Sequence, residues 1–327
     1  MNAPMPLVAR LKRWLTPAGW ALAVLALGLV GYRLMTGGGV DLLLERPRAW
    51  WTVVPAIPAY ALASVAVTAA WWALLKPFER RGLTFPSAHR IYALSQIGKY
   101  LPGNVMHFVG RAAMARAEGT PVTRTGVTMV QEGVLMMTAS LGLAAALGGT
   151  QWLGISPALS VPAVILMALM ALAISSAPEI ARRAGLGRTG DGDRRAPGHW
   201  RLAWAASALA GYVLFFCASG VIFQWILTSL NAQVPFGLTL AAVCAGWLAG
   251  FVTPGASAGI GVREAVLITA LGSTAGPAAA PAALMFRLVT TGGDILLFAS
   301  GAALRRPALH RLRSLVLQRL PSRFSVR

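Results

Sequence analysis

Acidic residues and cysteines are scarce in this sequence of 327 residues. Ten Asp and Glu stand against 29 Lys and Arg, and only 12% of all residues are charged, whereas 56% are apolar. So few charged side chains cannot cover the surface of a soluble protein of this size, and the composition is typical of a polytopic membrane protein. The formal net charge is +19, but the basic residues lie between apolar runs. We therefore expect no nucleic acid partner.

Residues that hold metals and cofactors are also few. The two cysteines, Cys217 and Cys244, lie in different apolar segments and predict neither a disulfide framework nor a CxxC site. The four histidines are scattered without the spacing of metal ligands. No phosphate-binding P-loop and no GxGxxG opening a helix after a strand is present. We expect no metal and no cofactor, which disfavours ATP-driven transport and nicotinamide chemistry.

Long apolar runs, in contrast, are abundant. They lie at about 17–36, 50–75, 122–148, 158–177, 203–228, 237–252, 259–275 and 281–303. Most of them reach the roughly 20 residues that a helix needs to cross a bilayer. The first run follows Arg10, Lys12 and Arg13 but ends without a convincing cleavage site, so we interpret it as a retained helix and not as a signal peptide.

The distribution of basic residues predicts the orientation in the membrane. Basic residues gather at 10–13, 76–90, 178–201 and 305–327, whereas the loops at 149–157, 229–236 and 276–280 contain none. By the positive-inside rule, both termini are then cytoplasmic. Eight spans satisfy this orientation if the segment 86–116 enters the membrane and returns on the same side.

One unusual pattern occurs twice, 152 residues apart. The copies are Gly98-x3-Pro102-Gly103-x7-Arg111 and Gly250-x3-Pro254-Gly255-x7-Arg263. Pro-Gly ends a helix and frees backbone groups, which in a membrane must be satisfied by protein or by a water-filled cavity. The second break also contains Gly259 and Gly261. The pattern therefore predicts a duplicated broken helix, as in transporters built from two repeats around a central site.

The predicted fold is an all-α polytopic membrane protein with about eight transmembrane helices and re-entrant or broken helices in two pseudo-repeats. We expect a membrane domain over 1–304, with halves at about 50–177 and 203–304 and a Gly/Arg-rich linker at 178–200. The tail 305–327 alternates leucine with arginine, which is typical of a basic amphipathic helix on the inner leaflet. A solvated tail without a partner is the alternative.

Several ionisable residues are expected within or at the edge of the apolar layer: Lys99, His107, Arg111, Glu132, Arg263, Glu264, Arg287 and Asp294. Such groups are costly to bury alone, so they pair with one another or line water. In one interpretation the arginines only neutralise the acids and lock the bundle. In the other, Arg111, Arg263, Arg287 and Lys99 bind a phosphate, which the guanidinium fork matches well. Glu132, Glu264 and Asp294 would then be exchangeable counter-charges.

Two weak motif matches point to enzymes. Residues 255–259 fit the G-x-S-x-G pattern of hydrolases, with Ser257 as nucleophile and His107 as a conceivable base, but the pattern requires a strand before the turn. Asp191-Gly192-Asp193 resembles the cation-binding DxD of nucleotide-sugar transferases but lies in the linker. Small residues suit a close-packed helix break better. We expect no enzymatic activity.

The two helix-break segments resemble a known family. The segment from Ile97 to Arg111 (IGKYLPGNVMHFVGR), followed by Thr253-Pro254-Gly255 and by Gly259-Ile260-Gly261-Val262-Arg263-Glu264-Ala265, is similar to the flippase-like transmembrane family named after lysylphosphatidylglycerol synthase. The resemblance covers about 10–305. One departure is Ala258, where members of the family often have glycine.

The resemblance implies a bacterial inner-membrane protein that translocates or handles lipids. In the bacterial multiple peptide resistance factor, a separate cytoplasmic domain performs lysyl transfer, and we expect this chain to be a stand-alone member without that activity. The leading hypothesis is a translocase that accepts an anionic phospholipid or polyprenyl-phosphate headgroup between the two repeats. The alternative is a non-transporting partner that presents a lipid carrier to a glycosyltransferase or lipid-modifying enzyme. The oligomeric state stays open.

Overall fold

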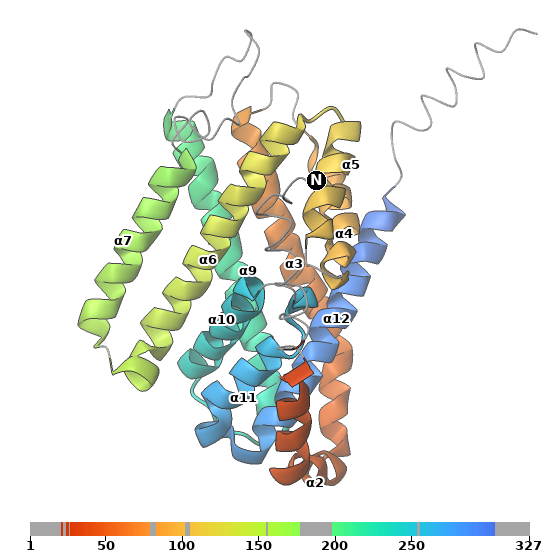
Figure 1. The fold of residues 1–327 in the computed structure, drawn as a ribbon, viewed down its shortest axis with the longest axis vertical. Helices are drawn as coiled ribbons and strands as arrows, with labels where there is room; N and C mark the ends of the chain where they lie inside the picture. Colours follow the sequence, from red (N-terminus) through yellow and green to blue (C-terminus); the bar gives the residue numbers. More distant parts are fainter. Residues whose placement is uncertain are drawn as a thin grey trace, which may run out of the picture.

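The computed structural model describes residues 21, 24–25, 27–78, 83–101, 105–154, 156–176, 198–253 and 256–304, and all regular secondary structure in these residues is helical (Figure 1). An all-α polytopic fold is thereby confirmed. Several predicted features lie outside the described residues: Pro102, Gly103, Pro254, Gly255, the Asp191-Gly192-Asp193 match, nearly all of the linker 178–200 and the tail 305–327.

Long apolar helices form the frame of the molecule. They are α3 (Val53–Leu75), α6 (Val122–Leu153), α9 (Gly198–Ser229) and α12 (Ala279–Ala303). Each overlaps one of the four segments of the described chain that are long and apolar enough to cross a membrane. Helix α3 packs between α9 and α12, while α6 packs on α9 and on the shorter α7 (Pro157–Ser176). Large side chains without solvent exposure, among them Trp71, Tyr212 and Phe216, fill the centre.

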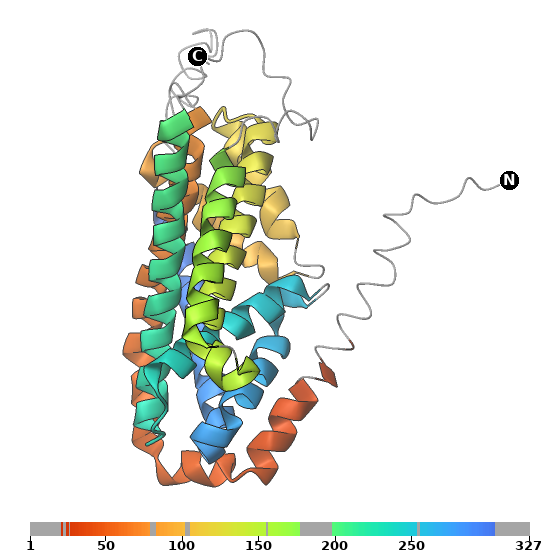
Figure 2. The ribbon, with the colours of Figure 1, turned by 90° about the vertical axis from the view of Figure 1, so that its left-hand side faces the viewer.

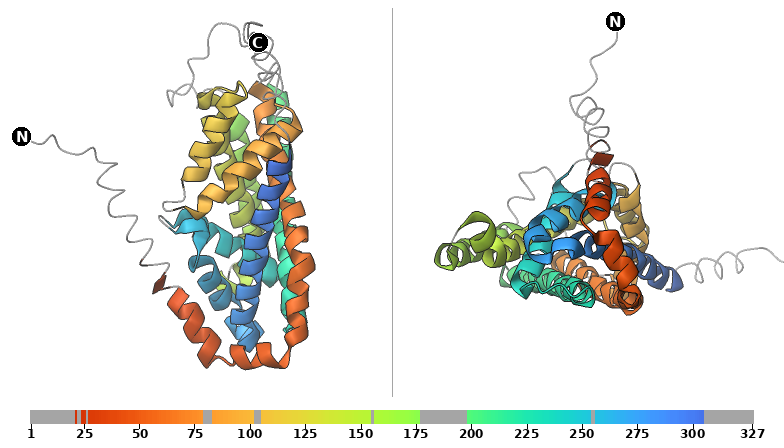
Figure 3. Two further views of the ribbon diagram at one scale, coloured as in Figure 1. Left: turned by 90° about the vertical axis from the view of Figure 1, so that its right-hand side faces the viewer. Right: turned by 90° about the horizontal axis from the view of Figure 1, so that it is seen from below.

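Two helical hairpins enter this frame from opposite ends (Figure 1). The first hairpin consists of α4 (Phe85–Gln96), η3 (Ile97–Tyr100) and α5 (Met106–Ala117). The second consists of α10 (Phe236–Val252), η4 (Ser257–Gly259) and α11 (Val262–Ala275). Their tips, η3 and η4, contact each other near half height, which is also visible from the side (Figure 3, left). The repeated sequence pattern thus marks the tips of the two hairpins.

The second hairpin changes the predicted number of separate spans. The runs at 237–252 and 259–275 were both expected to cross the bilayer, but they form the two legs of one hairpin that begins and ends at the same end of the bundle (Figure 1). The legs have 17 and 14 residues. At 1.5 Å per residue they measure about 25 and 21 Å, less than the hydrocarbon core of roughly 30 Å.

Glycines permit the sharp hairpin geometry at specific positions. A Cβ on Gly98 would lie 2.7 Å from the backbone nitrogen of His107, so only glycine lets the two legs of the first hairpin approach this closely. Gly261 opens α11 with φ of 82°, a left-handed value that suits glycine. Ala258 also has a positive φ, 51°, which glycine adopts more readily than alanine.

The first part of the described chain closes the lower end of the bundle. Helix α2 (Gly39–Glu45) and the short helix η1 (Pro47–Thr52) lead into α3, and α2 contacts α12 and the turn η5 (Gly276–Ala278). Figure 2 and the view from below in Figure 3 show that helical residues 27–36 lean away from the frame. The hairpin tips, which meet near half height, are thus separated from this closed end by the lower half of the bundle (Figure 3, left).

Candidate functional site

A cavity of about 100 Å³ lies between the hairpins and the long helices. Its ionisable lining consists of Lys99, His107, Arg111, Glu132, Arg263 and Asp294. Apolar lining comes from Met129, Met136, Phe108, Phe215, Trp247 and Phe251. The cavity is therefore amphipathic, because charged side chains from both hairpins and aromatic rings both line it.

Arg111 of the first hairpin contacts one acidic and two aromatic side chains, while its Nε has no hydrogen-bond partner among the described residues. It is 1% exposed and forms an ion pair with Glu132 of α6, whose other carboxylate oxygen accepts a hydrogen bond of 2.8 Å from the Tyr92 hydroxyl. The guanidinium carbon lies 3.9 Å from the centre of the Tyr92 ring and 5.2 Å from that of Trp71. Such contacts compensate the cost of burying the charge. The pair fastens the first hairpin to α6.

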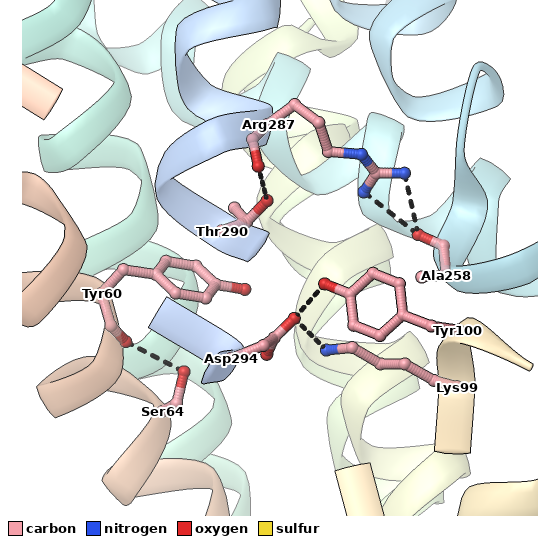
Figure 4. Close-up of polar contacts among 8 residues, drawn as sticks. All are labelled: Tyr60, Ser64, Lys99, Tyr100, Ala258, Arg287, Thr290 and Asp294. Carbon is pink, nitrogen blue, oxygen red and sulfur yellow. Dashed lines mark hydrogen bonds and ion pairs between the residues drawn. The ribbon is translucent and has the colours of Figure 1, made fainter. Parts of the chain in front are cut away.

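The tip of the first hairpin is fastened to α12 through Asp294 (Figure 4). One carboxylate oxygen of Asp294 accepts hydrogen bonds from Lys99 Nζ at 2.7 Å and from the Tyr100 hydroxyl at 2.6 Å. These are charge-assisted contacts in a mostly buried position, since the Asp294 side chain is 6% exposed. Asp294 thus connects two consecutive tip residues to a helix of the other half.

The second hairpin is fastened to α12 through Arg287. Arg287 Nε lies 3.1 Å from Glu264, and its terminal nitrogens donate to the carbonyl of Ala258 at 3.3 and 3.4 Å (Figure 4). Glu264 also accepts a 2.7 Å hydrogen bond from the backbone nitrogen of Gly261, which caps the start of α11. Both hairpins are therefore tied to the long helix that follows them, with the charges reversed between the halves.

Arg263 differs from the other cations. Within the described part of the chain none of its nitrogens has an ion pair or hydrogen bond, whereas Arg111, whose Nε is also buried without a partner, keeps its ion pair with Glu132. A Cβ on Gly250 would lie 2.7 Å from Arg263 Cγ, and one on Gly259 would lie 2.7 Å from Arg263 Nε. The Arg263 side chain thus passes through a slot between two glycines into the cavity.

The structure brings most of the predicted site residues together. Lys99, Arg111, Arg263, Glu132 and Asp294 line the large cavity. Arg287 and Glu264 line a smaller neighbouring cavity of about 30 Å³, and Arg263 borders both. The interpretation in which acids neutralise arginines holds for Arg111 and Arg287, whereas Asp294 pairs with Lys99 instead of an arginine.

Sequence reasoning missed the tyrosines and the aromatic wall. The sequence contains five tyrosines. Tyr60 and Tyr92 line the large cavity, Tyr100 binds Asp294, and Tyr212 is fully buried. A rare polar aromatic inside an apolar run is the signal that would have found them, because a buried hydroxyl seeks a polar partner. The wall formed by Trp247 and Phe251, which stack with ring centres 5.0 Å apart, has no comparable signal.

Ser257 lies at the second hairpin tip without the surroundings of a nucleophile. Its hydroxyl donates to the backbone carbonyl of Leu101 at 3.4 Å, and no described basic side chain hydrogen-bonds it. The strand that a nucleophile elbow requires does not occur at this place, where the chain forms η4. Within the described residues, no group of three His, Cys, Asp or Glu side chains that could hold a metal ion is found.

Long apolar helices, opposed re-entrant hairpins and a buried charged cavity define a multi-pass membrane protein. The chain matches the family described as the lysylphosphatidylglycerol synthase TM region over residues 18–301. It belongs to this family. A search of curated proteins found no match.

Proposed function

We propose that the protein is a lipid translocase of the flippase or scramblase type that moves a lipid with an anionic headgroup through the cavity between the hairpins. The headgroup is that of a phospholipid or a polyprenyl phosphate. One observation carries this proposal: the repeated arginines, Arg111 and Arg263, line the same cavity although they lie 152 residues apart in sequence. An excess of cations beside an aromatic wall suits a phosphate attached to an apolar chain.

The two hairpin tips provide a physical route for alternating access. The tips enter from opposite ends, meet near half height and are each tied to α12 by ion pairs, Lys99 to Asp294 and Glu264 to Arg287. An anionic headgroup competes with Asp294 for Lys99, which weakens one tie while the other remains. Two arrangements of similar energy would then exist, as transport requires.

Orientation and location follow the distribution of charge. Helices α3 and α4 meet, as α5 and α6 do, at the end of the bundle that carries Lys76, Arg90 and Arg116. The positive-inside rule supports an orientation in which this end faces the cytoplasm of a bacterial inner membrane, with both termini expected on the same side. The protein acts without a cofactor and without enzymatic turnover, and its partners are membrane lipids.

Lipid movement in proteoliposomes tests the proposed function. Labelled anionic and zwitterionic phospholipids and a polyprenyl phosphate are compared for the wild type and for the double variant Arg111→Ala/Arg263→Ala. The wild type is expected to move an anionic lipid at least tenfold faster than the double variant. The control is Arg33→Ala/Arg116→Ala, which removes two exposed arginines and should leave the rate unchanged.

If the folded wild-type protein moves none of these lipids, the proposal of a translocase is wrong. The protein would then be a partner that presents a lipid carrier to a separate glycosyltransferase or lipid-modifying enzyme. In that case Arg111→Ala should abolish complex assembly or product formation in the presence of the enzyme.

A further inference from the structure

We propose that Arg263 is the anion-binding side chain of the large cavity, and that the cavity selects lipid headgroups with a single negative charge. This inference rests on the proposed function and deepens it by naming the residue and the charge of the headgroup. The evidence lies in the partners of each charged group, in the glycine slot and in the net charge of the lining.

All other cations of the site already have a partner. Arg111 is paired with Glu132, Lys99 with Asp294 and Arg287 with Glu264. Glu264, the carboxylate next to Arg263 in sequence, is occupied by the backbone nitrogen of Gly261 and by Arg287 Nε. A ligand that bound Arg111 or Lys99 would first have to displace a buried carboxylate. Arg263 can bind an anion without the loss of an existing ion pair.

No side chain of the described residues forms an ion pair with Arg263. Arg263 is the second residue of α11. The amino end of a helix carries a partial positive charge, so a cation is disfavoured there unless an anion is bound. Its Nε is buried without a partner, and a buried guanidinium nitrogen without an acceptor is costly. An anionic oxygen in the cavity would satisfy both the charge and the unused donor.

The glycine slot holds the side chain in this position. Gly250 lies in α10, and Gly259 lies at the hairpin tip with φ of 69°. An alanine at Gly250 would place its Cβ 2.7 Å from Arg263 Cγ and 2.8 Å from Arg263 Nε, closer than atoms approach without displacement. Gly250 and Gly259 are therefore positioning residues, which aim the guanidinium and do not themselves touch the lipid.

The charge of the lining limits the charge of the ligand. With His107 counted as neutral, three cationic side chains, Lys99, Arg111 and Arg263, and two carboxylates, Glu132 and Asp294, leave one net positive charge on the cavity. A headgroup with one negative charge neutralises the site, whereas a second negative charge would remain uncompensated in a poorly solvated cavity. Trp247 and Phe251 offer an apolar surface for the part of the lipid that follows the phosphate.

Lipid binding to the purified full-length chain tests this inference independently of transport. Native mass spectrometry compares phosphatidylglycerol, cardiolipin and phosphatidylcholine, which carry one, two and no net negative charges. We expect phosphatidylglycerol to bind best, and Arg263→Gln to reduce its affinity about tenfold or more, to the level of phosphatidylcholine. Arg116→Gln, an exposed arginine on α5, is the matched control and should bind like the wild type.

Gly250→Ala is a second variant that leaves the arginine in place. The atoms nearest to the new Cβ belong to the flexible Arg263 side chain, and the nearest backbone atom, Gly259 Cα, lies 3.1 Å away. A folded protein is therefore expected, in contrast to Gly98→Ala, but the displaced guanidinium should bind phosphatidylglycerol as weakly as Arg263→Gln does. Unchanged binding by either variant, or a preference of the wild type for cardiolipin, would overturn the proposal. If soluble glycerol phosphate displaces phosphatidylglycerol at equal concentration, the site binds a free anion, and the assignment of a lipid ligand is wrong.

The binding and transport experiments together distinguish a failure of this inference from a failure of the proposed translocase function. Fast movement of phosphatidylglycerol by Arg263→Gln would overturn the role of Arg263 and leave transport in place. Charge-selective binding through Arg263 by a wild type that moves no lipid would overturn transport and support the inference.

Discussion

At the scale of single residues, two arginines at equivalent positions of the sequence repeat have different roles. Arg111 is enclosed by Glu132, Tyr92 and Trp71, so it stabilises the contact between the first hairpin and α6. Arg263 has no such partner and reaches the cavity through a glycine slot. The duplicated pattern thus contains one structural and one available guanidinium, a distinction that decides which of them can bind an anion.

The structural role of Arg111 leads to a prediction about stability. Glu132→Gln should lower the free energy of unfolding by about 3–5 kcal/mol, because it leaves a buried guanidinium without its counter-charge. Replacing both partners by apolar residues, Arg111→Met with Glu132→Leu, should recover most of this loss. Unfolding in detergent by heat or denaturant measures the effect. A Glu132→Gln protein as stable as the wild type would show that the pair does not hold the hairpin.

At the scale of elements, the hairpins depend on how closely their legs approach. In the first hairpin Gly98 faces the backbone of Met106 and His107, and in the second Gly250 faces Gly259 and the side chain of Arg263. The first glycine of the repeated pattern therefore has the same function in both copies, since it lets the returning leg pass close to the outgoing one.

Substitution at Gly98 tests this role of the hairpin legs. Gly98→Ala should destabilise the protein by about 1–3 kcal/mol, because the new Cβ would lie 2.7–3.0 Å from backbone atoms that have to move. Gly126→Ala in α6 is the matched control, since nothing lies within 4 Å of its Cβ position. That change should be neutral or stabilise by up to about 1 kcal/mol. Equal thermal midpoints for both variants would refute close leg packing.

At the scale of the whole molecule, the opposed hairpins give the fold an inverted arrangement around one cavity. The first hairpin and the second enter from opposite ends, and α12 contacts both of them (Figure 1). Because α12 carries Asp294 and Arg287, a movement of one hairpin tip would act on the same helix that holds the other. This connection is what a transporter with alternating access needs.

The proposed orientation can be measured by cysteine labelling. In a background with Cys217→Ala and Cys244→Ala, Arg116→Cys and Thr274→Cys place single thiols at exposed positions at opposite ends of the bundle. By the positive-inside rule, an impermeant reagent should label Thr274→Cys from the periplasmic side and Arg116→Cys only in inverted vesicles. The reverse pattern would contradict the proposed orientation.

Many residues of the candidate site could be predicted from the sequence, because ionisable side chains are rare within the apolar segments of this chain. Lys99, Arg111, Arg263, Glu132 and Asp294 were identified without coordinates, and the repeat located both helix breaks. The partners were not predictable. Glu132 and Arg111 are 21 residues apart and Lys99 and Asp294 are 195, and only the approach of separate helices selects which acid meets which base.

The sequence by itself determined the membrane class, the helical fold and the positions of the two breaks, because these depend on hydrophobic length and on backbone chemistry that act locally. Tertiary structure alone decided that 236–252 and 262–275 form a hairpin, that Asp294 binds Lys99 and Tyr100, and that Arg263 pairs with none of the described residues. These features depend on packing between segments far apart in the chain. No local pattern of residues records that packing.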